Sequence, residues 1–280
     1  MAVEPGNISV IISVYKNVAA LKVVLDGLAL QSVSGFEVLV SEDGEDDAMR
    51  DFVSTYKTDR FSLRHLHQPD QGWRKNQALN NAIRNAQGSY LVFIDGDCVP
   101  HPEFVRAHAR FAEPNVMLSG NRVMLGAKMA RRLQSGNIKL ETLPSLLWRY
   151  LCTIIFDKEG SRFEESLYFD PDGPLSRFAG KKSHGILGCN FSCARQDLLD
   201  INGFDEDYVW PRVGEDNDVQ WRLEGNGLVM KSVRNLAIQY HLHHGRPHYT
   251  SVNESRLLFN EKKKLAHYYC SNGINKSKEH

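Results

Sequence analysis

Short apolar runs rich in β-branched and aromatic residues recur through the first part of the chain, separated by segments with helical hydrophobic spacing. Such runs predict buried strands, whereas apolar residues three and four positions apart predict amphipathic helices. The strands are expected at Ile8–Val14, Phe36–Ser41, Phe61–Leu66 and Tyr90–Ile94. The helices are expected around Leu21–Leu28, over residues 48–57, and from Gly72 to a C-terminal cap at Gly88. This alternation predicts an α/β fold built on a parallel sheet with right-handed crossovers.

The alternation fades after residue 97. We expect a helix over Pro102–Phe111, a strand over Val116–Val123, helices over Arg195–Ile201 and through Val219, Trp221 and Leu223, and a frayed tail over Ser271–His280. The apolar stretch Leu143–Phe156 is too short to span a bilayer and fits a buried or an interfacial helix. Basic residues within 127–142 leave open a peripheral contact with an anionic membrane, although a core helix beside a solvated face is the simpler interpretation. Residues 157–185 predict an irregular, mobile loop.

Composition narrows the functional classes. The 280 residues contain 34 Lys and Arg against 34 Asp and Glu, so no overall positive field suggests nucleic-acid binding. Met1–Asn7 lacks a signal-peptide pattern, and no apolar run approaches the ~20 residues that span a bilayer. The five cysteines form no CxxC pair, which indicates reduced, buried and unreactive thiols in a cytosolic protein. A ligand shared by Cys189 and Cys193 is the alternative.

The strand at Tyr90–Ile94 runs directly into Asp95, Gly96 and Asp97. Ligands of open α/β sheets bind at the carboxyl ends of strands, and two carboxylates there suit Mg²⁺ or Mn²⁺ carrying a phosphorylated substrate. Gly96 leaves room for a diphosphate against the backbone. The same residue types are also common in turns, so a purely structural role as a turn is the alternative. The chain has neither a GxGxxG nor a GxxxxGK[ST] loop, so phosphate binding must come from a metal or from basic side chains.

A second candidate cluster lies at Glu215 and Asp216, directly before an amphipathic helix. A carboxylate there with a depressed pKa would stay ionised at neutral pH, as a general base requires. The structural alternative is a favourable interaction of these acidic residues with the helix dipole. Nearby Trp210 either offers a flat face to a sugar ring or fills the core.

A third cluster is the run from Tyr240 to His244, which contains three histidines. If it is a strand, His241 and His243 share one face. One neutral imidazole would then be available to complete a metal site begun by Asp97. The alternative is a surface loop.

These motifs together resemble the GT-A glycosyltransferases, particularly the large inverting family 2, with a C-terminal pattern similar to that of galactosyltransferases and bacterial chondroitin-type polymerases. The resemblance extends from about residue 7 to 245. It rests on motifs that occur in the family's order, namely Ser13-Val14-Tyr15, Glu42-Asp43-Gly44, Gln71–Lys75, Asp95-Gly96-Asp97, Gly188–Ser192, Gly203–Glu206, Gly214–Asp218 and Tyr240-His241. It implies a single GT-A domain over residues 1–270, with a central, mainly parallel sheet. The implied parts are a nucleotide-binding half (1–98), a metal and acceptor half (99–250), a C-terminal helix (251–270) and a flexible tail (271–280).

The resemblance also implies how the donor and the metal are bound. Asp43 would accept a hydrogen bond from uracil or ribose. Asp97 would bind the divalent metal directly with Asp95 beside it, and His241, or alternatively His244, would be the late histidine ligand. The donor-nucleotide positions would be Val14, Tyr15, Asp43, Trp73, Arg74, Lys75, Asp95 and Gly96.

On the acceptor side, Asp216 matches the family's catalytic base and Glu215 the neighbour that contacts a sugar in relatives. Acceptor contacts are expected from Trp210, Asn190 and Gly214. Glu42 replaces the first of the two aspartates that usually precede the glycine of the second-strand motif, which changes little. The segment from Trp210 to Gly214 replaces the usual glycine-rich run, so the acceptor wall should differ from that of vertebrate-type galactosyltransferases.

The implied function is inverting transfer of Gal, GalNAc, GlcNAc or GlcA from a UDP-sugar to a hydroxyl of a saccharide or glycolipid acceptor, with Mn²⁺ or Mg²⁺ as cofactor. The implied setting is surface polysaccharide or lipopolysaccharide synthesis in the cytoplasm, with peripheral contact at the inner face of the membrane as an option. A sugar-nucleotide pyrophosphorylase is one alternative, but residues 14–20 lack its glycine-rich basic loop. A non-catalytic module that binds nucleotide or glycan is the other alternative. Neither the oligomeric state nor the sugar follows from the sequence.

Overall fold

The centre of the molecule is a seven-stranded sheet with the strand order β3-β2-β1-β4-β8-β6-β9. The computed structural model describes residues 2–145, 161–174, 179, 185–210, 215–245 and 252–276. The first four strands pair in parallel, and β8 is antiparallel to both of its neighbours, so the sheet is mainly parallel, as predicted. Its strands are β1 (Ile8–Val14), β2 (Phe36–Glu42), β3 (Phe61–Leu66), β4 (Tyr90–Asp95), β6 (Val116–Ser119), β8 (Phe191–Ala194) and β9 (Val229–Ser232).

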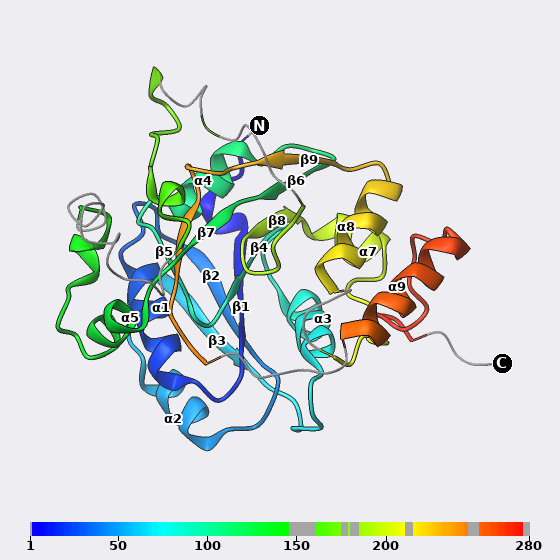
Figure 1. Cartoon of the computed structure of the whole chain (residues 1–280), viewed down its shortest axis with the longest axis horizontal. Helices are drawn as coiled ribbons and strands as arrows, with labels where there is room; N and C mark the ends of the chain where they lie inside the picture. The colour runs from blue at the N-terminus through cyan, green and yellow to red at the C-terminus, as the bar shows by residue number, and fades with distance from the viewer. Residues whose placement is uncertain are drawn as a thin grey trace.

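Helices cover both faces of this sheet (Figure 1). One face packs against α1 (Val18–Ala29), α2 (Asp47–Thr55), α4 (Phe104–Phe111) and α5 (Ala127–Gln134). The other packs against α3 (Lys75–Asn85), α7 (Arg195–Asp200) and α8 (Glu215–Gly225), and α9 (Val252–Leu265) lies outside α8. Short 3₁₀ turns occur at Pro5–Asn7, Leu140–Thr142 and Phe163–Ser166.

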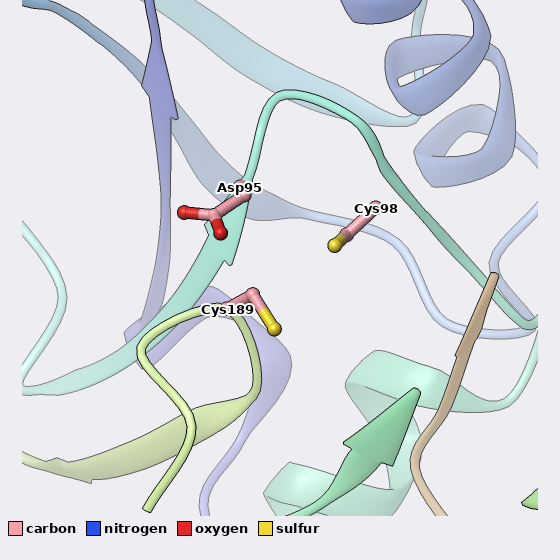
Figure 2. Close-up of side chains that lie close together, drawn as sticks. All are labelled: Asp95, Cys98 and Cys189. Carbon is pink, nitrogen blue, oxygen red and sulfur yellow. The ribbon is translucent and has the colours of Figure 1, made fainter. Parts of the chain in front are cut away.

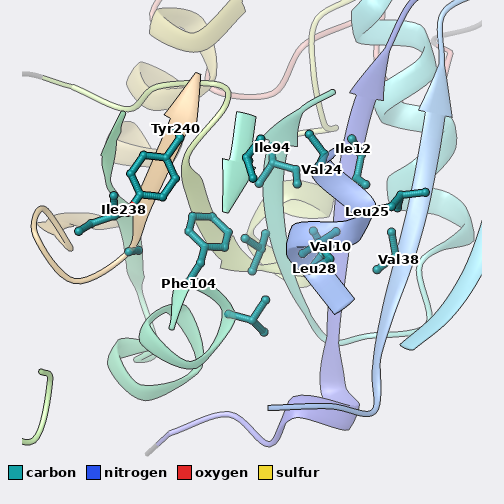
Figure 3. Close-up of a cluster of buried hydrophobic side chains, with 14 of the residues drawn as sticks. Val10, Ile12, Val24, Leu25, Leu28, Val38, Ile94, Phe104, Ile238 and Tyr240 are labelled. Atoms are coloured by element: carbon teal, nitrogen blue, oxygen red, sulfur yellow. The ribbon is translucent and has the colours of Figure 1, made fainter. Parts of the chain in front are cut away.

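The central strands are apolar on both sides because both of their faces are covered. Val10 and Ile12 belong to the core beneath α1, whereas Ile11 between them belongs to the core beneath α3. Figure 3 shows the first of these cores, where Val10 and Ile12 lie beside Val24 of α1. Alternate strand residues point to opposite faces, so one strand supplies both cores.

A second, three-stranded sheet has the order β5-β10-β7, with β5 at Cys98–Pro100, β7 at Asn121–Met124 and β10 at Ile238–His241. Strand β10 runs antiparallel to β5 and parallel to β7, which sets His241 opposite both Cys98 and Met124. The Asp95–Asp97 turn joins β4 of the large sheet to β5 of the small one. Residues far apart in the sequence therefore meet beside this turn.

Several boundaries differ from the prediction. The expected strand over residues 116–123 is broken at Gly120 into β6 and β7, where a side chain would lie 2.4 Å from Asn190 Nδ2. Helix α3 begins at Lys75 rather than Gly72 and ends at an Ala86 cap. Gly88 is not that cap; a Cβ at this position would lie 2.6 Å from the backbone nitrogen of Ser9 in β1.

The C-terminal residues also differ from the frayed tail that we expected. Asn275 N–H donates to Asn202 Oδ1 at 2.7 Å, and Arg84 Nη1 donates to the Ile274 carbonyl at 2.9 Å. These bonds hold the segment as far as Lys276 against α3 and the turn after α7. Residues 277–280 lie outside the described part of the chain, as do most of the apolar stretch 143–156 and much of the expected loop 157–185.

Among the helices that the structure describes, none combines the length and the apolar character needed to cross a membrane. The exposed outer surface of α9 carries Leu257 and Leu265 together with Lys263 and Lys264. The expected peripheral membrane contact stays a prediction.

Candidate active site

The two aspartates of the β4–β5 turn face different partners. Asp95 Oδ1 accepts from the ammonium of Lys75, the first residue of α3, at 3.1 Å. Asp97 Oδ2 lies 3.5 Å from His241 Nε2 and 3.2 Å from His244 Nε2. The glycine between the aspartates lets the turn approach β1 closely, since a Cβ at Gly96 would lie 2.6 Å from a Val14 methyl carbon. One short turn thus carries a cation-paired carboxylate and an imidazole-paired carboxylate.

The imidazole pair is positioned by the small sheet. Strand β10 ends at His241, and Leu242 N–H then donates to the Asp97 carbonyl at 2.8 Å. The chain turns there, so His244 approaches Asp97, with its ring centroid 5.1 Å from that of His241. The prediction that His241 and His243 share one face of a strand is therefore wrong, because the strand ends at His241.

The charges of this cluster keep Asp97 ionised. Burial alone would raise its pKa, but the hydrogen bond from His244 and the charges of both histidines lower it below the usual value. Burial lowers the pKa of His241, whereas the bond to Asp97 raises that of His244. His241 Nδ1 is buried without a hydrogen-bond partner among the described residues. An ionised carboxylate beside imidazole nitrogens is a donor set that fits a divalent transition ion such as Mn²⁺.

Asp216 is the second residue of α8, and the loop before β8 holds its side chain in place. Its Oδ2 accepts from the Gly188 N–H at 2.8 Å, and a Cβ at Gly188 would lie only 2.2 Å from Oδ1. Burial raises the pKa of Asp216, while the charges of Lys75 and Arg122 oppose that rise and the charge of Asp95 adds to it. Our prediction that the pKa of Asp216 is depressed is therefore wrong, because desolvation raises this pKa by more than the nearby cations lower it. A carboxyl whose pKa lies closer to neutrality is a better proton acceptor at that pH.

The loop expected to bind the nucleotide is organised by Asp43. Its Oδ2 accepts from the Arg74 N–H at 2.7 Å and its Oδ1 from Gln68 Nε2 at 2.8 Å, so both oxygens are already engaged. Its own N–H donates to the Val14 carbonyl at 3.1 Å, which joins this loop to the end of β1. Burial raises the pKa of Asp43. The direct bond from Asp43 to uracil or ribose stays a prediction.

Tyr15, the residue after β1, has an exposed aromatic side chain. Tyr15 is 53% exposed, and its hydroxyl donates to Asp70 at 3.2 Å. Lys16 pairs with the same carboxylate at 2.7 Å. The side chain of Trp73 is partly buried, and Arg74 Nη1 donates to the Trp73 carbonyl at 3.0 Å. The expected donor-binding residues lie at or just after the carboxyl ends of β1, β2 and β4 and around the start of α3.

The prediction that Asn190 contacts the acceptor is wrong. It is fully buried, and its Nδ2 donates to the carbonyls of Asn121 at 2.8 Å and Ala237 at 3.0 Å. Its Oδ1 lies 3.2 Å from His108 Nε2. A side chain engaged on all sides ties β8 to the small sheet and cannot contact an acceptor.

The remaining acceptor-side residues are only partly described. Trp210 is 36% exposed, so it is not a core residue. Gly214 lies outside the described residues, and Glu215 begins α8 with a side chain outside them. A cavity of about 460 Å³ lies elsewhere, between α1 and residues 133–141, and no predicted site residue lines it.

The sequence interpretation missed three residues beside Asp95. Cys98, the first residue of β5, and Cys189, in the loop before β8, come from distant segments yet lie with Asp95 so that one donor atom from each is within 4.8 Å of the others (Figure 2). Arg122 of β7 donates to Cys189 Sγ at 3.2 Å. Cys98 directly follows the Asp95–Asp97 motif and Cys189 lies within the Gly188–Ser192 motif, so the sequence offered a signal for both thiols but none for Arg122. The suggested pairing of Cys189 with Cys193 is not seen; the neighbouring thiol is Cys98.

Residues 9–161 match the profile of glycosyl transferase family 2, and residues 179–245 match that of the N-terminal domain of galactosyltransferase. The first match covers more than half of the chain, so the chain belongs to glycosyl transferase family 2. This confirms the resemblance drawn from the motifs. The seven-stranded, mainly parallel sheet with its second small sheet is the GT-A fold of such enzymes.

Curated relatives share modest identity over most of the chain. A validoxylamine A glucosyltransferase of Streptomyces hygroscopicus subsp. jinggangensis is 28% identical over 268 residues, which cover 90% of this chain and 59% of the relative. The chondroitin synthase of Escherichia coli is 24% identical over 240 residues, covering 84% of this chain and 34% of the relative. The chain therefore spans only part of the length of these relatives.

Solved structures support the fold. Staphylococcus aureus TarS 1–349 in complex with UDP-GlcNAc superimposes with a TM-score of 0.61 at 16% identity, covering 93% of this chain and 65% of that one. The mannosyltransferase PcManGT from Pyrobaculum calidifontis, in complex with GDP-Man and Mn²⁺, gives a TM-score of 0.56 at 18% identity, covering 94% and 66%. Family and fold together support sugar transfer as the class of chemistry.

Proposed function

We propose that the chain is an inverting, metal-dependent glycosyltransferase that moves a hexose-type sugar from a UDP-sugar to a hydroxyl of a saccharide or glycolipid acceptor. The observation that carries this proposal is the grouping of Asp216, Lys75 and Asp95 on one side of a turn whose other aspartate, Asp97, faces two imidazoles. Transfer from a nucleotide sugar needs a proton acceptor and positive charge at the leaving diphosphate. In this grouping Asp216 would be the proton acceptor, and Lys75 together with a metal ion at Asp97 would supply the positive charge.

Asp97, His241 and His244 would hold the divalent ion. Carboxylate oxygen alone suits Mg²⁺, but imidazole nitrogen is a better ligand for Mn²⁺, so we favour Mn²⁺ of the two. The bound ion supplies Lewis-acid stabilisation of the charge that develops on the leaving diphosphate. Lys75, which already neutralises Asp95, would add a second positive charge near the same phosphates.

Asp216 would be the general base. Its carboxylate would take the proton of the acceptor hydroxyl while the hydroxyl oxygen attacks the anomeric carbon, and the bond from that carbon to the diphosphate would break on the opposite face. A single displacement of this kind turns an α-linked donor into a β-glycoside. The Gly188 N–H fixes Oδ2 at 2.8 Å, and Oδ1 would take the proton.

The donor nucleotide would lie along the edge formed by Val14, Tyr15 and Asp43, with Trp73 and Arg74 beside it. Asp43 would act mainly by holding this loop, because both of its oxygens already accept hydrogen bonds. The UDP-GlcNAc complex of TarS supports a uridine donor. The GDP-Man complex of PcManGT makes a guanosine donor the natural comparison in any test.

For the biological setting, we propose surface polysaccharide or lipopolysaccharide synthesis at the cytoplasmic side of the membrane. The likeness to Escherichia coli chondroitin synthase supports a polysaccharide product. The basic and apolar outer surface of α9 is compatible with a lipid-linked acceptor nearby.

A donor screen tests this function. The full chain is incubated with UDP-Gal, UDP-GalNAc, UDP-GlcNAc, UDP-GlcA or GDP-Man and a set of saccharide acceptors, with Mn²⁺, with Mg²⁺, or with EDTA. We expect acceptor-dependent UDP release with one donor, larger with Mn²⁺ and lost with EDTA. Nucleotide binding without release for every pair would identify a binding module instead. Pyrophosphate-dependent breakdown of the UDP-sugar to UTP would identify a pyrophosphorylase.

A further inference from the structure

A second group of potential metal ligands lies beside the proposed Mn²⁺ site and shares its turn. It consists of one carboxylate oxygen of Asp95 and the thiols of Cys98 and Cys189, all mutually within 4.8 Å. The three side chains come from the end of β4, the start of β5 and the loop before β8 (Figure 2). Both cysteines are buried, with exposed fractions of 0% and 2%, so the thiols face each other rather than solvent. Sulfur donors play no part in the sugar-transfer chemistry proposed above.

The spacing suits zinc. Zinc–sulfur bonds are near 2.3 Å, so a tetrahedral ion holds its sulfurs about 3.8 Å apart. The present spacing of up to 4.8 Å is therefore closed by side-chain movements of about 1 Å. Three protein ligands would leave the fourth tetrahedral position for water, as in many zinc sites with an open position.

Charge balance and outer contacts also favour a thiophilic ion. Two thiolates and one carboxylate around Zn²⁺ leave a single net negative charge. Arg122 already donates to Cys189 Sγ at 3.2 Å, so its charge would offset the net negative charge of the occupied site. Donors of this kind around the ligands typically strengthen a metal site.

We propose that Asp95, Cys98 and Cys189 form a binding site for a thiophilic divalent cation, Zn²⁺ in the first place, distinct from the Asp97–imidazole site. Binding releases the two thiol protons to solvent and involves no change of oxidation state. The ion would compete for Asp95 with Lys75 and would stand beside the turn that carries Asp97. Zn²⁺ would therefore inhibit a Mn²⁺-dependent transfer rather than replace Mn²⁺.

Cobalt spectroscopy tests the site without reference to activity. The full chain is reduced with a phosphine, freed of metal and titrated with Co²⁺. We expect a thiolate-to-cobalt charge-transfer band in the near ultraviolet, saturating at one ion and bleached by Zn²⁺, which binds such ligands more tightly than Co²⁺. Cys98 also lies within 4.8 Å of the ligand atoms of Asp97 and His241, so the Cys189→Ser variant below decides which group gives the band. A band that Cys189→Ser weakens belongs to the Asp95 group. Absence of the band from the reduced wild-type chain would overturn the proposal.

Three variants locate the ligands. Cys189→Ser should lose at least half of the charge-transfer intensity and bind Zn²⁺ at least ~10-fold more weakly, because even outer-contact changes cost 10- to 100-fold. Cys98→Ser should also lose at least half of the band intensity, whichever group holds the ion, since Cys98 lies within 4.8 Å of the ligand atoms of both groups. Cys193→Ala removes a buried thiol outside the group and should leave the titration unchanged. An unaltered band in folded Cys189→Ser would overturn the proposal, and a band lost in Cys193→Ala would do the same.

Discussion

The large sheet and the small sheet each surround one aspartate of the shared turn with a different chemistry. At the end of β4, in the large sheet, Asp95 pairs with the Lys75 ammonium and adjoins Asp216. On the small-sheet side, Asp97 faces the nitrogens of His241 and His244. We therefore expect the two carboxylates, two residues apart in sequence, to serve separate tasks: Asp95 would contribute to charge and proton handling at the large sheet, and Asp97 would bind the metal at the small one.

The two sheets also differ in how the chain builds them. Strands β1 to β4 follow one another within the first 95 residues, each joined to the next by a connection that carries a helix. Strands β5, β7 and β10 come from segments around residues 98, 121 and 238, so their register depends on contacts made across the whole fold. The first region is specified locally and the second by tertiary packing. The predictions below test whether their functions separate as their construction does.

The largest effect is expected for Asp216→Asn, on the large-sheet side. The amide cannot take a proton, so transfer should fall by roughly 10²- to 10⁴-fold, the usual value of a general base. Nucleotide affinity and Mn²⁺ affinity should change little, because neither ligand is assigned to Asp216. Initial rates of UDP release and calorimetric titration with UDP and Mn²⁺ measure both. The Gly188 N–H still has a carbonyl oxygen to bond, which keeps the local fold.

Unchanged turnover in Asp216→Asn would remove Asp216 from the base role. Asn217→Ala, at the exposed position next to Asp216 in α8, tests the general sensitivity of this helix. A large loss in that control as well would mean that the helix position, not the carboxylate, is what transfer requires.

The second prediction separates the two aspartates of the turn. Asp97→Asn should weaken Mn²⁺ binding by more than the ~10- to 100-fold that accompanies loss of an outer contact, because Asp97 is assigned as a direct ligand. Asp95→Asn should weaken it less, since Lys75 and not an imidazole is its partner. Mn²⁺ titration followed by electron paramagnetic resonance compares the variants. Equal losses would show that the two carboxylates act as one site.

The third prediction distinguishes the two imidazoles. His241 lies at the end of β10 with a side chain 9% exposed, whereas the His244 side chain is 44% exposed. A ligand held by a strand loses less freedom on binding, so His241→Asn should lower Mn²⁺ affinity by more than the ~10- to 100-fold of an outer contact, and His244→Asn by less than His241→Asn. His243→Asn is the matched control between them. A larger loss in His244→Asn would assign the ligand to the loop histidine.

Most of the large-sheet region could be predicted from the sequence, because its signals are local. The strand bounds of β1, β2, β3 and β4 agree with the hydrophobic runs to within a residue. The errors fall where distant segments meet. The break at Gly120 depends on the Asn190 side chain packed against it, and the pairing of His244 with Asp97 depends on where β10 stops.

The candidate site divides in the same way. Asp95 and Asp97 could be identified as candidate site residues from the sequence because they directly follow a strand. The side chains that each of them contacts could not be identified in this way. The pKa of Asp216 could not be judged from its helix position, since the burial that raises it comes from the loop carrying Gly188. Asn190 was predicted to contact the acceptor because it lies in a motif, but both hydrogen bonds of its amide nitrogen join the two sheets.

The smallest effect concerns one buried histidine from each region. His108 lies against Ser192 of β8, with Nδ1 2.8 Å from its hydroxyl, and His101 follows β5 and accepts from the Glu103 N–H at 3.1 Å. Burial lowers the pKa of each to about 4. Both are therefore neutral in the folded chain, whereas in the unfolded chain each takes up a proton near pH 6.5.

Their contribution to stability is complete above pH 6.5 and is lost as the pH falls from 6.5 towards 4, because only the unfolded state then binds the protons. Each histidine should lower the free energy of unfolding by about 1.4 kcal/mol per pH unit in that window. Urea unfolding at pH 7.5, 6.5 and 5.5 measures this slope. His108→Gln and His101→Asn should each remove one histidine's share of it. If the pH dependence of the free energy of unfolding falls equally in both variants, the two sheets unfold as one unit. If it falls only in His108→Gln, the small sheet opens separately before the large one.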